Sequence, residues 1–335
     1  MNLKTNRRII ITSDIHGNLV LFKKLLDKVK FNKKDILIIN GDIYEKGLEN
    51  LDTLEYLMNL IKEYTIYIIK GNCDLILAKL KYINHDTFNF FAFRRGCSVI
   101  NEMANRLNIT LTPDIDLSNL NKLYYNNFKK YYDFANEFID YIILNDKYYI
   151  SHKGNTENIL NKLPIIDNGY INISGHKPSI LYNSNIPSFN PYYYDSNNLF
   201  IDGANNVSPF GQLNYIIINN DLISMDYVSS FNKFISKIDY NYNNGNAITT
   251  NSIIDNLTFI KEEGEFLYYK VKDNIVISHN SEVRKDKFCY FATNYFISLI
   301  KGAEYEICKM TDTLCVIKYK GITGYVERGV LDYAI

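Results

Sequence analysis

The sequence predicts an α/β fold with a helical insertion, followed by a small all-β domain. In residues 9–74, apolar β-branched runs alternate with segments of helical periodicity, as in a parallel sheet with crossover helices. A mainly helical pattern then occupies about residues 78–140. We interpret it as an insertion that partly covers the candidate functional site at the ends of these strands. Short strand-like runs separated by turn signals fill residues 257–335, as in a small β-barrel.

The first strand is predicted at residues 9–11, where three isoleucines precede Thr12-Ser13-Asp14-Ile15-His16-Gly17-Asn18. After Gly17, apolar residues recur at intervals of three and four, which predicts an amphipathic helix. A carboxylate and an imidazole two positions apart at the end of a strand are the residue types of half a divalent-metal site. The alternative is a polar turn in which Asp14 caps the helix and His16 is exposed.

Two further strands repeat this arrangement. Residues 36–40 lead to Gly41-Asp42, a second helix begins at about Leu51, and residues 66–69 lead to Lys70-Gly71-Asn72-Cys73-Asp74. Because a right-handed parallel βαβαβ unit places its strand ends side by side, we expect Asp14, Asp42 and Asn72 to converge. Carboxylate, amide and imidazole ligands suit hard and borderline divalent cations.

Later strands also end in polar residues. A predicted hairpin at residues 141–150 leads to Ser151-His152, residues 171–173 lead to Ser174-Gly175-His176, and residues 199–201 lead to Asp202. A hairpin at residues 213–226 closes the unit. Three of the five histidines therefore directly follow strands, which favours metal ligation over isolated structural roles. His85 and His279 lack this context.

Composition excludes several classes of protein. Lys plus Arg and Asp plus Glu each number 37, so the net charge indicates no broad attraction to nucleic acid or membranes. The five cysteines show neither zinc-knuckle spacing nor a disulfide framework. No apolar run is long enough to span a bilayer, and a strand at residue 9 leaves no room for a signal peptide. We expect a soluble cytoplasmic protein.

The predicted domains are residues 1–228, a linker at residues 229–256 that is rich in Asn, Ser and Thr, and residues 257–335. Residues 321–326, Gly-Ile-Thr-Gly-Tyr-Val, resemble a stretch of bacterial SH3-like domains. That resemblance implies a peptide, a glycan or the first domain itself as a partner of the C-terminal domain.

Five ordered motifs over about residues 7–226 resemble those of the calcineurin-like metallophosphoesterases, and the resemblance implies a four-layer β-sandwich flanked by helices. The motifs are Asp14-x-His16-Gly17-Asn18, Gly41-Asp42, Gly71-Asn72-x-Asp74, His152 and Gly175-His176. Residues 41–47 and 175–178 are most similar to the bacterial and phage serine/threonine-phosphatase branch. That branch includes lambda phosphatase and the symmetrical diadenosine tetraphosphatases.

The resemblance implies a dinuclear metal centre, with Mn²⁺ as the first choice and Fe²⁺ or Zn²⁺ as alternatives. A hydroxide that bridges two divalent ions would attack phosphorus while the ions neutralise the phosphoryl oxygens. By resemblance, one ion would bind Asp14, His16 and Asp42. The other would bind Asp42, Asn72, His152 and His176.

The sequence departs from the phosphatase branch where that branch has its general acid. Cys73 stands in place of histidine, and Glu45 and Lys46 stand in place of Asp and Arg. Gly-Asn-Cys-Asp also resembles the small bacterial phosphodiesterases of the superfamily. Whether Cys73 is catalytic or only a small buried hydrophobe stays open at this point. The predicted catalytic residues are Asp42, Asn72, Cys73, Asp74 and Glu45.

Four basic residues are candidate phosphate ligands: Lys46, Lys70, Arg94 and Arg95. Lys46 and Lys70 fall where the phosphatase branch has Arg, although an ammonium group lacks the bidentate fork of a guanidinium. For the adjacent arginines, a solvated basic turn is the alternative.

The resulting hypothesis is a metal-dependent phosphoesterase acting on phosphomonoesters, phosphoproteins or dinucleoside polyphosphates. One alternative is a phosphodiesterase, based on Cys73. Another is a catalytically weak, metal-bound scaffold that binds phosphoryl groups. Such a protein would retain the metal ligands but lack the general acid.

Overall fold

The computed structural model describes residues 1–94, 97–153, 168–182, 186–220, 222–244, 249–253, 257–271, 273–283 and 288–335. The chain divides into two compact units. Unit 1 comprises Met1–His176, Pro191–Val207 and Leu213–Val228. Unit 2 comprises Lys177–Asn190, Ser208–Gln212 and Ser229–Ile335.

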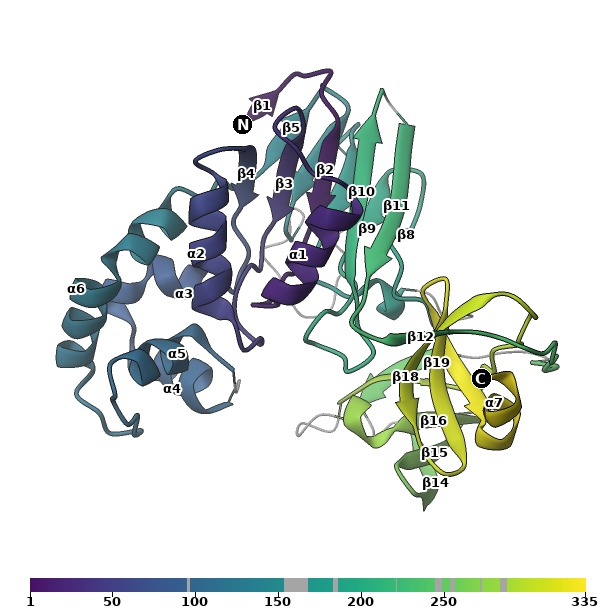
Figure 1. Cartoon of the computed structure of the whole chain (residues 1–335). Helices are drawn as coiled ribbons and strands as arrows, with labels where there is room; N and C mark the ends of the chain where they lie inside the picture. The colour runs from purple at the N-terminus through teal and green to yellow at the C-terminus, as the bar shows by residue number, and fades with distance from the viewer. Residues whose placement is uncertain are drawn as a thin grey trace. The chain divides into compact units, whose positions relative to one another are not determined.

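Unit 1 contains a five-stranded sheet in the order β11-β10-β2-β3-β4 (Figure 1). Its parallel core consists of β2 (Ile9–Thr12), β3 (Ile36–Asn40) and β4 (Thr65–Ile69). The hairpin of β10 (Leu213–Asn219) and β11 (Leu222–Val228) joins β2 in antiparallel orientation. The predicted α/β class is thus confirmed.

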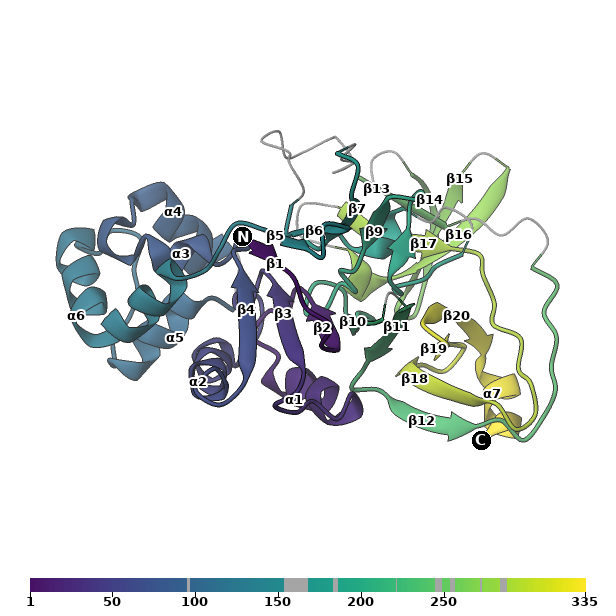
Figure 2. The same ribbon diagram turned by 90° about the horizontal axis from the view of Figure 1, so that it is seen from above.

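Helices α1 (Leu19–Lys28) and α2 (Asn50–Leu60) lie on one face of this sheet, and a second sheet lies on the other face (Figure 2). The Asn18 side chain caps α1 by accepting a hydrogen bond from the Leu21 amide at 3.1 Å. In β2, Ile10 packs in the core with the helices, whereas Ile9 and Ile11 pack between the sheets. Burial on both faces explains the continuous apolar run.

The second sheet of unit 1 has six strands in the order β1-β5-β6-β7-β9-β8. Strands β6, β7 and β9 are parallel, so their carboxyl ends meet at one edge. The strand bounds are Asn2–Leu3 (β1), Ile142–Leu144 (β5), Tyr148–Ser151 (β6), Ile171–Ser174 (β7), Tyr192–Tyr193 (β8) and Asn198–Phe200 (β9).

The helical insertion of unit 1 has its helices between Leu75 and Asn136. Its aromatic residues Tyr124, Phe128 and Tyr131 are buried in the core that also contains the helices of the sheet. The elements are α3 (Leu75–Ala78), η1 (Leu80–Tyr82), α4 (His85–Asn89), η2 (Phe90–Arg94), α5 (Val99–Arg106) and α6 (Leu117–Asn136).

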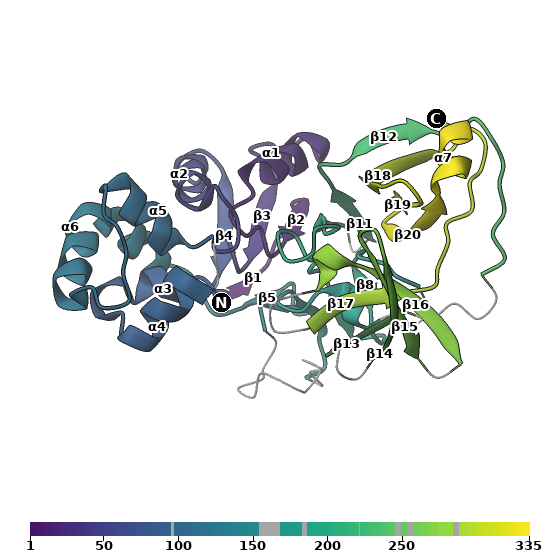
Figure 3. The ribbon, with the colours of Figure 1, turned by 90° about the horizontal axis from the view of Figure 1, so that it is seen from below.

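Unit 2 is mostly β-structure, arranged as a four-stranded sheet β12-β18-β19-β20 and a five-stranded sheet β13-β17-β16-β15-β14 (Figure 3). The first sheet contains β12 (Asn232–Ile235), β18 (Glu304–Met310), β19 (Leu314–Tyr319) and β20 (Ile322–Glu327). The second contains β13 (Thr249–Ile253), β14 (Thr258–Glu263), β15 (Phe266–Val271), β16 (Asn274–His279) and β17 (Phe288–Thr293). The helices among the described residues of the unit are short: η3 (Ser179–Leu181), η5 (Asn280–Glu282) and α7 (Arg328–Ala334).

The structure places β12 and β13 within the segment for which the sequence predicts a linker. Of the four residues of β12, only Phe234 is buried, so the strand has little apolar signal of its own. Pairing with β18 stabilises it instead. Among the described residues, no helix is long and apolar enough to cross a membrane.

Candidate metal centre

The backbone at the strand ends adopts a conformation that non-glycine residues rarely occupy. Positive φ angles occur at Asp14 (56°), His16 (48°), Asp42 (53°) and His176 (71°). The loops after β2 and β3 support one another, since the Asp14 amide donates to Gly41 O at 3.0 Å and the His16 amide donates to Asp42 O at 2.9 Å. Backbone strain of this kind concentrates at functional sites.

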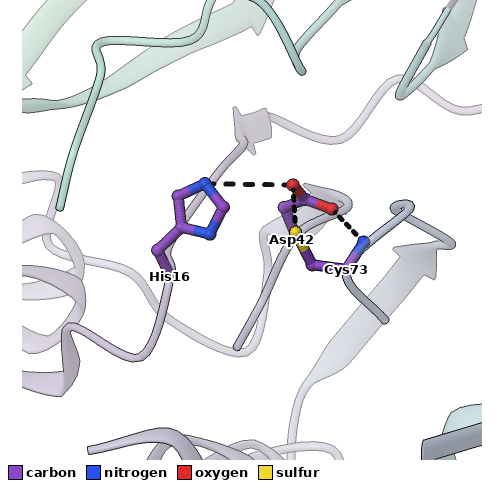
Figure 4. Close-up of side chains that lie close together, drawn as sticks. All are labelled: His16, Asp42 and Cys73. Carbon is purple, nitrogen blue, oxygen red and sulfur yellow. Dashed lines mark hydrogen bonds and ion pairs between the residues drawn. The ribbon is translucent and has the colours of Figure 1, made fainter. Parts of the chain in front are cut away.

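Asp42 lies at the centre of the converging side chains, with 1% of its surface exposed. Its Oδ1 lies 3.2 Å from His152 Nε2, and its Oδ2 lies 3.8 Å from His16 Nε2. Cys73 donates to both oxygens, through its amide to Oδ1 at 2.9 Å and through Sγ to Oδ2 at 2.9 Å (Figure 4). The carboxylate of Asp42 is therefore in reach of donors from three other strand ends.

Two groups of possible metal ligands share Asp42. One comprises His16, Asp42 and Cys73, and the other comprises Asp42, His152 and His176. Within each group, the ligand atoms lie within 4.8 Å of one another. A shared carboxylate is the arrangement that two neighbouring cations need, because its charge offsets their repulsion.

Asp14 provides a buried carboxylate oxygen for the same place. Its Oδ2 accepts hydrogen bonds from Ser13 Oγ and, at 3.1 Å, from the His176 amide. Its Oδ1 is buried and accepts no hydrogen bond from the residues that the structure describes, and it lies 3.7 Å from His16 Nε2. Burial raises the pKa of Asp14 to about 6, and a bound cation would offset this cost of desolvation.

A backbone carbonyl orients the ring of His152, as is usual for histidines that bind metals. His152 Nδ1 lies 2.7 Å from Asn40 O, so this nitrogen donates and Nε2 faces Asp42 and, at 3.3 Å, Asn72 Oδ1. Burial opposes protonation of His152, but the charges of Asp42 and Asp14 outweigh it and raise its pKa to about 10. Burial and the neighbouring His152 lower the pKa of His176 to about 3, which keeps this imidazole neutral.

The carboxylate of Asp74 binds backbone amides. It accepts from Gly71 N at 2.8 Å, Asp42 N at 3.0 Å and Ile43 N at 3.0 Å, and thereby ties the loop after β4 to the loop after β3. Glycine is required at position 71, because a Cβ there would lie 2.1 Å from Asp42 N. For Asp74, this geometry supports a positioning role rather than contact with substrate.

Glu45 and Lys46 point to different places. Glu45 Oε1 accepts from Ser98 Oγ at 3.0 Å and from Val99 N at 2.9 Å, at the start of α5. Lys46 Nζ instead lies 2.9 Å from His16 Nε2. The Lys46 ammonium group is thus beside His16, within the cluster of candidate metal ligands.

The other predicted phosphate ligands are not brought into this cluster. Lys70 Nζ lies 3.4 Å from Asp140 Oδ1 in an ion pair whose Asp side chain is 82% exposed. Arg95 and the side chain of Arg94 lie outside the described residues.

Two asparagines that were not among the predicted site residues hold the loop after β2 in place. Asn205 Nδ2 donates to Ile15 O at 2.6 Å and Asp14 O at 3.3 Å, and Asn206 Nδ2 donates to His16 O at 2.9 Å. They directly follow Asp202-Gly203-Ala204 at the end of β9, and this position after a strand is the sequence feature that could have identified them. The abundance of asparagine in this chain conceals them.

The sequence profile of the calcineurin-like phosphoesterase family matches residues 7–199, more than half of the chain. The chain therefore belongs to this family, and the predicted recognition is confirmed. The family implies divalent metal ions, and the donor set around Asp42 fits them.

Similar curated proteins are symmetrical bis(5'-nucleosyl)-tetraphosphatases. That of Buchnera aphidicola subsp. Schizaphis graminum is 49% identical over 70 residues, covering 21% of this chain and 25% of the relative. That of Wigglesworthia glossinidia brevipalpis is 35% identical over 81 residues, covering 23% of this chain and 29% of the relative. The matches thus span only about a quarter of the relatives' length.

Similar solved structures include a putative diadenosine tetraphosphatase, with a TM-score of 0.43, 15% identity, and coverage of 68% of this chain and 98% of the other. Another is a serine/threonine phosphatase from Saccharomyces cerevisiae with similarity to human PP5. Its TM-score is 0.44 at 10% identity, with coverage of 69% and 84%.

Proposed function

We propose that this chain is a metal-dependent phosphoester hydrolase. The observation that carries the proposal is the position of Asp42, whose carboxylate is shared by two groups of potential ligands at converging strand ends. The substrates we expect are phosphorylated small molecules, nucleotides or phosphoproteins, with dinucleoside polyphosphates first because of the names of the similar curated proteins.

The residues around Asp42 would hold two divalent ions, with Mn²⁺ as the first candidate. Such ions would acidify a water molecule and neutralise phosphoryl oxygens. We assign one ion to Asp14, His16 and Asp42. We assign the other to Asp42, Asn72, His152 and His176.

The chain's own groups orient these ligands and the substrate. Asn40 O fixes the ring orientation of His152, and Asp74 fixes the loop that carries Asp42. The Lys46 ammonium group would bind a phosphoryl oxygen as a point charge. Cys73 Sγ lies 2.9 Å from Asp42 Oδ2, at the sequence position where the phosphatase branch has its acid.

A substrate panel tests this proposal. Purified protein would be incubated with p-nitrophenyl phosphate, a phosphopeptide and diadenosine tetraphosphate, each with Mn²⁺, Fe²⁺, Zn²⁺ or no metal. We expect metal-dependent hydrolysis that Asp42→Asn reduces to background, because the variant loses the shared negative charge. Folded protein that binds metal and phosphate but turns over no substrate would contradict hydrolysis and support the scaffold alternative.

Phosphodiester hydrolysis is the second candidate, favoured by the place of Cys73 beside Asp42. Diesters with good leaving groups need little protonation of the departing oxygen. Bis-p-nitrophenyl phosphate in the same panel separates the two activities. A higher kcat/KM for the diester than for the monoester would establish the phosphodiesterase reading.

A further inference from the structure

A cavity of about 680 Å³ lies in the helical insertion of unit 1, between η1, the start of α4 and the first half of α6. Its volume falls within the range of small-molecule sites. Every residue that lines it lies between Lys81 and Asn126 in sequence, so the strand-end residues around Asp42 are not part of its wall. We call it the insertion cavity.

The wall of the insertion cavity favours an anion. It includes the ammonium groups of Lys81 and Lys122, and no acidic side chain is among its described lining residues. Lys81 Nζ lies 4.1 Å from the ring centroid of Tyr125 and 5.0 Å from that of Tyr132, which holds this ammonium group at the wall. Cationic groups held on a protein surface attract phosphates.

The same wall also offers an aromatic surface and amide groups. Tyr82 lines the cavity and is 81% exposed, although a large aromatic side chain gains free energy when it is covered. Asn126 adds a side-chain amide, which has both donors and an acceptor. A ring for stacking, amides for edge contacts and ammonium groups for phosphate together match a nucleotide.

We infer that the insertion cavity binds a nucleotide, with its base against Tyr82 and its phosphates beside Lys81 and Lys122. This site goes beyond the proposed hydrolytic function, because it uses none of the strand-end residues. It predicts that nucleotide binding persists when the candidate metal centre is disabled. It also predicts that base and phosphate contribute separately to affinity.

The test is equilibrium binding of a fluorescent N-methylanthraniloyl ATP to the full chain in EDTA, followed by anisotropy. We expect saturable binding that Asp42→Asn leaves unchanged. Tyr82→Ala and Lys122→Glu are each expected to weaken binding by about tenfold or more, through loss of stacking and of charge. Both positions are exposed, so the substitutions leave the core intact.

Matched controls are Tyr333→Ala, at a tyrosine that is 79% exposed in unit 2, and Lys129→Glu, outside the cavity on α6. We expect both to bind as the unaltered chain does.

Unlabelled ATP should compete at far lower concentration than inorganic phosphate or adenosine. Absence of saturable binding, equal affinity in all variants, or competition by phosphate as effective as that by ATP would overturn the inference. Because no step requires hydrolysis, an inactive metal centre would leave this test valid.

Discussion

Cys73 stands where the phosphatase branch that this chain resembles has a histidine. Its side chain is fully buried, and its thiol donates to Asp42 Oδ2 at 2.9 Å. A thiol at this distance can share its proton with the Asp42 carboxylate, but it does not carry the positive charge that a protonated imidazole would bring. The rate for poor leaving groups should therefore suffer most.

Replacing Cys73 by His tests whether protonation limits the rate. We expect kcat/KM for phenyl phosphate, whose phenolate is a poor leaving group, to rise at least about tenfold, because general acid catalysis contributes up to about 10²–10⁴-fold. The value for p-nitrophenyl phosphate should change less. Cys73→Ser is the control for size and should leave the ratio of the two substrates as it is. An unchanged ratio in Cys73→His would rule out leaving-group protonation as the limit.

Asn205 is expected to position the loop that carries Asp14 and His16. Asn205→Ala removes the hydrogen bonds to Ile15 O and Asp14 O, so we expect Mn²⁺ affinity, measured by calorimetry, to fall about 10- to 100-fold. Asn127→Ala is the matched control, since that side chain bonds to Leu123 O on the exposed side of α6. If Asn205→Ala and Asn127→Ala bind Mn²⁺ with equal affinity, the loop that carries Asp14 and His16 keeps its shape without Asn205.

Glu55 links three helices of unit 1. It lies on α2 and accepts hydrogen bonds from Arg106 at 3.0 Å on α5, and from Lys130 at 3.2 Å and Tyr131 on α6. The Tyr131 hydrogen bond, aided by Lys130 and Arg106 against the cost of burial, lowers the pKa of Glu55 from 4.5 to about 2. The charge of Glu55 therefore holds α5 and α6 of the insertion against α2, in addition to their apolar packing.

The stability that Glu55 contributes depends on pH. Because its folded pKa is lowered, the contribution is fully present above pH 4.5 and is lost as pH falls toward about 2. Glu55→Gln should lower the free energy of unfolding at pH 7 by about 1 kcal/mol or less, since the group is partly exposed. Urea unfolding at pH 7 and pH 3.5 should show this difference shrinking at the lower pH.

The control for Glu55→Gln is Asp133→Asn, which removes an exposed pair with Lys129 within α6 alone. We expect a smaller effect there because no second helix is involved. A Glu55→Gln difference that stays constant or grows on acidification would contradict the stated sign.

Unit 2 includes two segments that precede residue 229 in the sequence. Phe189 and Phe210 lie in these segments and are 0% and 3% exposed. Their partners come from the C-terminal part of the same unit, since the Phe189 amide donates to Gly321 O at 3.2 Å and Lys318 Nζ donates to Phe210 O at 2.9 Å. The boundary predicted at residue 228 would separate these partners.

A chain truncated after Val228 should therefore be less soluble than the full chain. Exposing each phenylalanine costs about 1.5–3 kcal/mol, and the exposed surface would promote association. Size-exclusion chromatography and binding of a hydrophobic dye measure this effect. A monomeric truncated protein that binds no more dye than the full chain would show that unit 1 retains both segments in a buried state.

The sequence alone predicted the three parallel strands of the core and the position of Asp14, Asp42 and Asn72 at their adjacent ends, because both follow from local patterns. Periodicity defines strands and helices, and parallel strand ends meet at one edge. The fold was needed to show that Asp74 binds three amides, that Glu45 faces α5 and that Asn205 holds the loop after β2. These contacts join positions distant in sequence, and their polar residue types are common throughout the chain. Side-chain chemistry identifies candidate ligands, whereas only three-dimensional packing distinguishes a ligand from the residue that positions it.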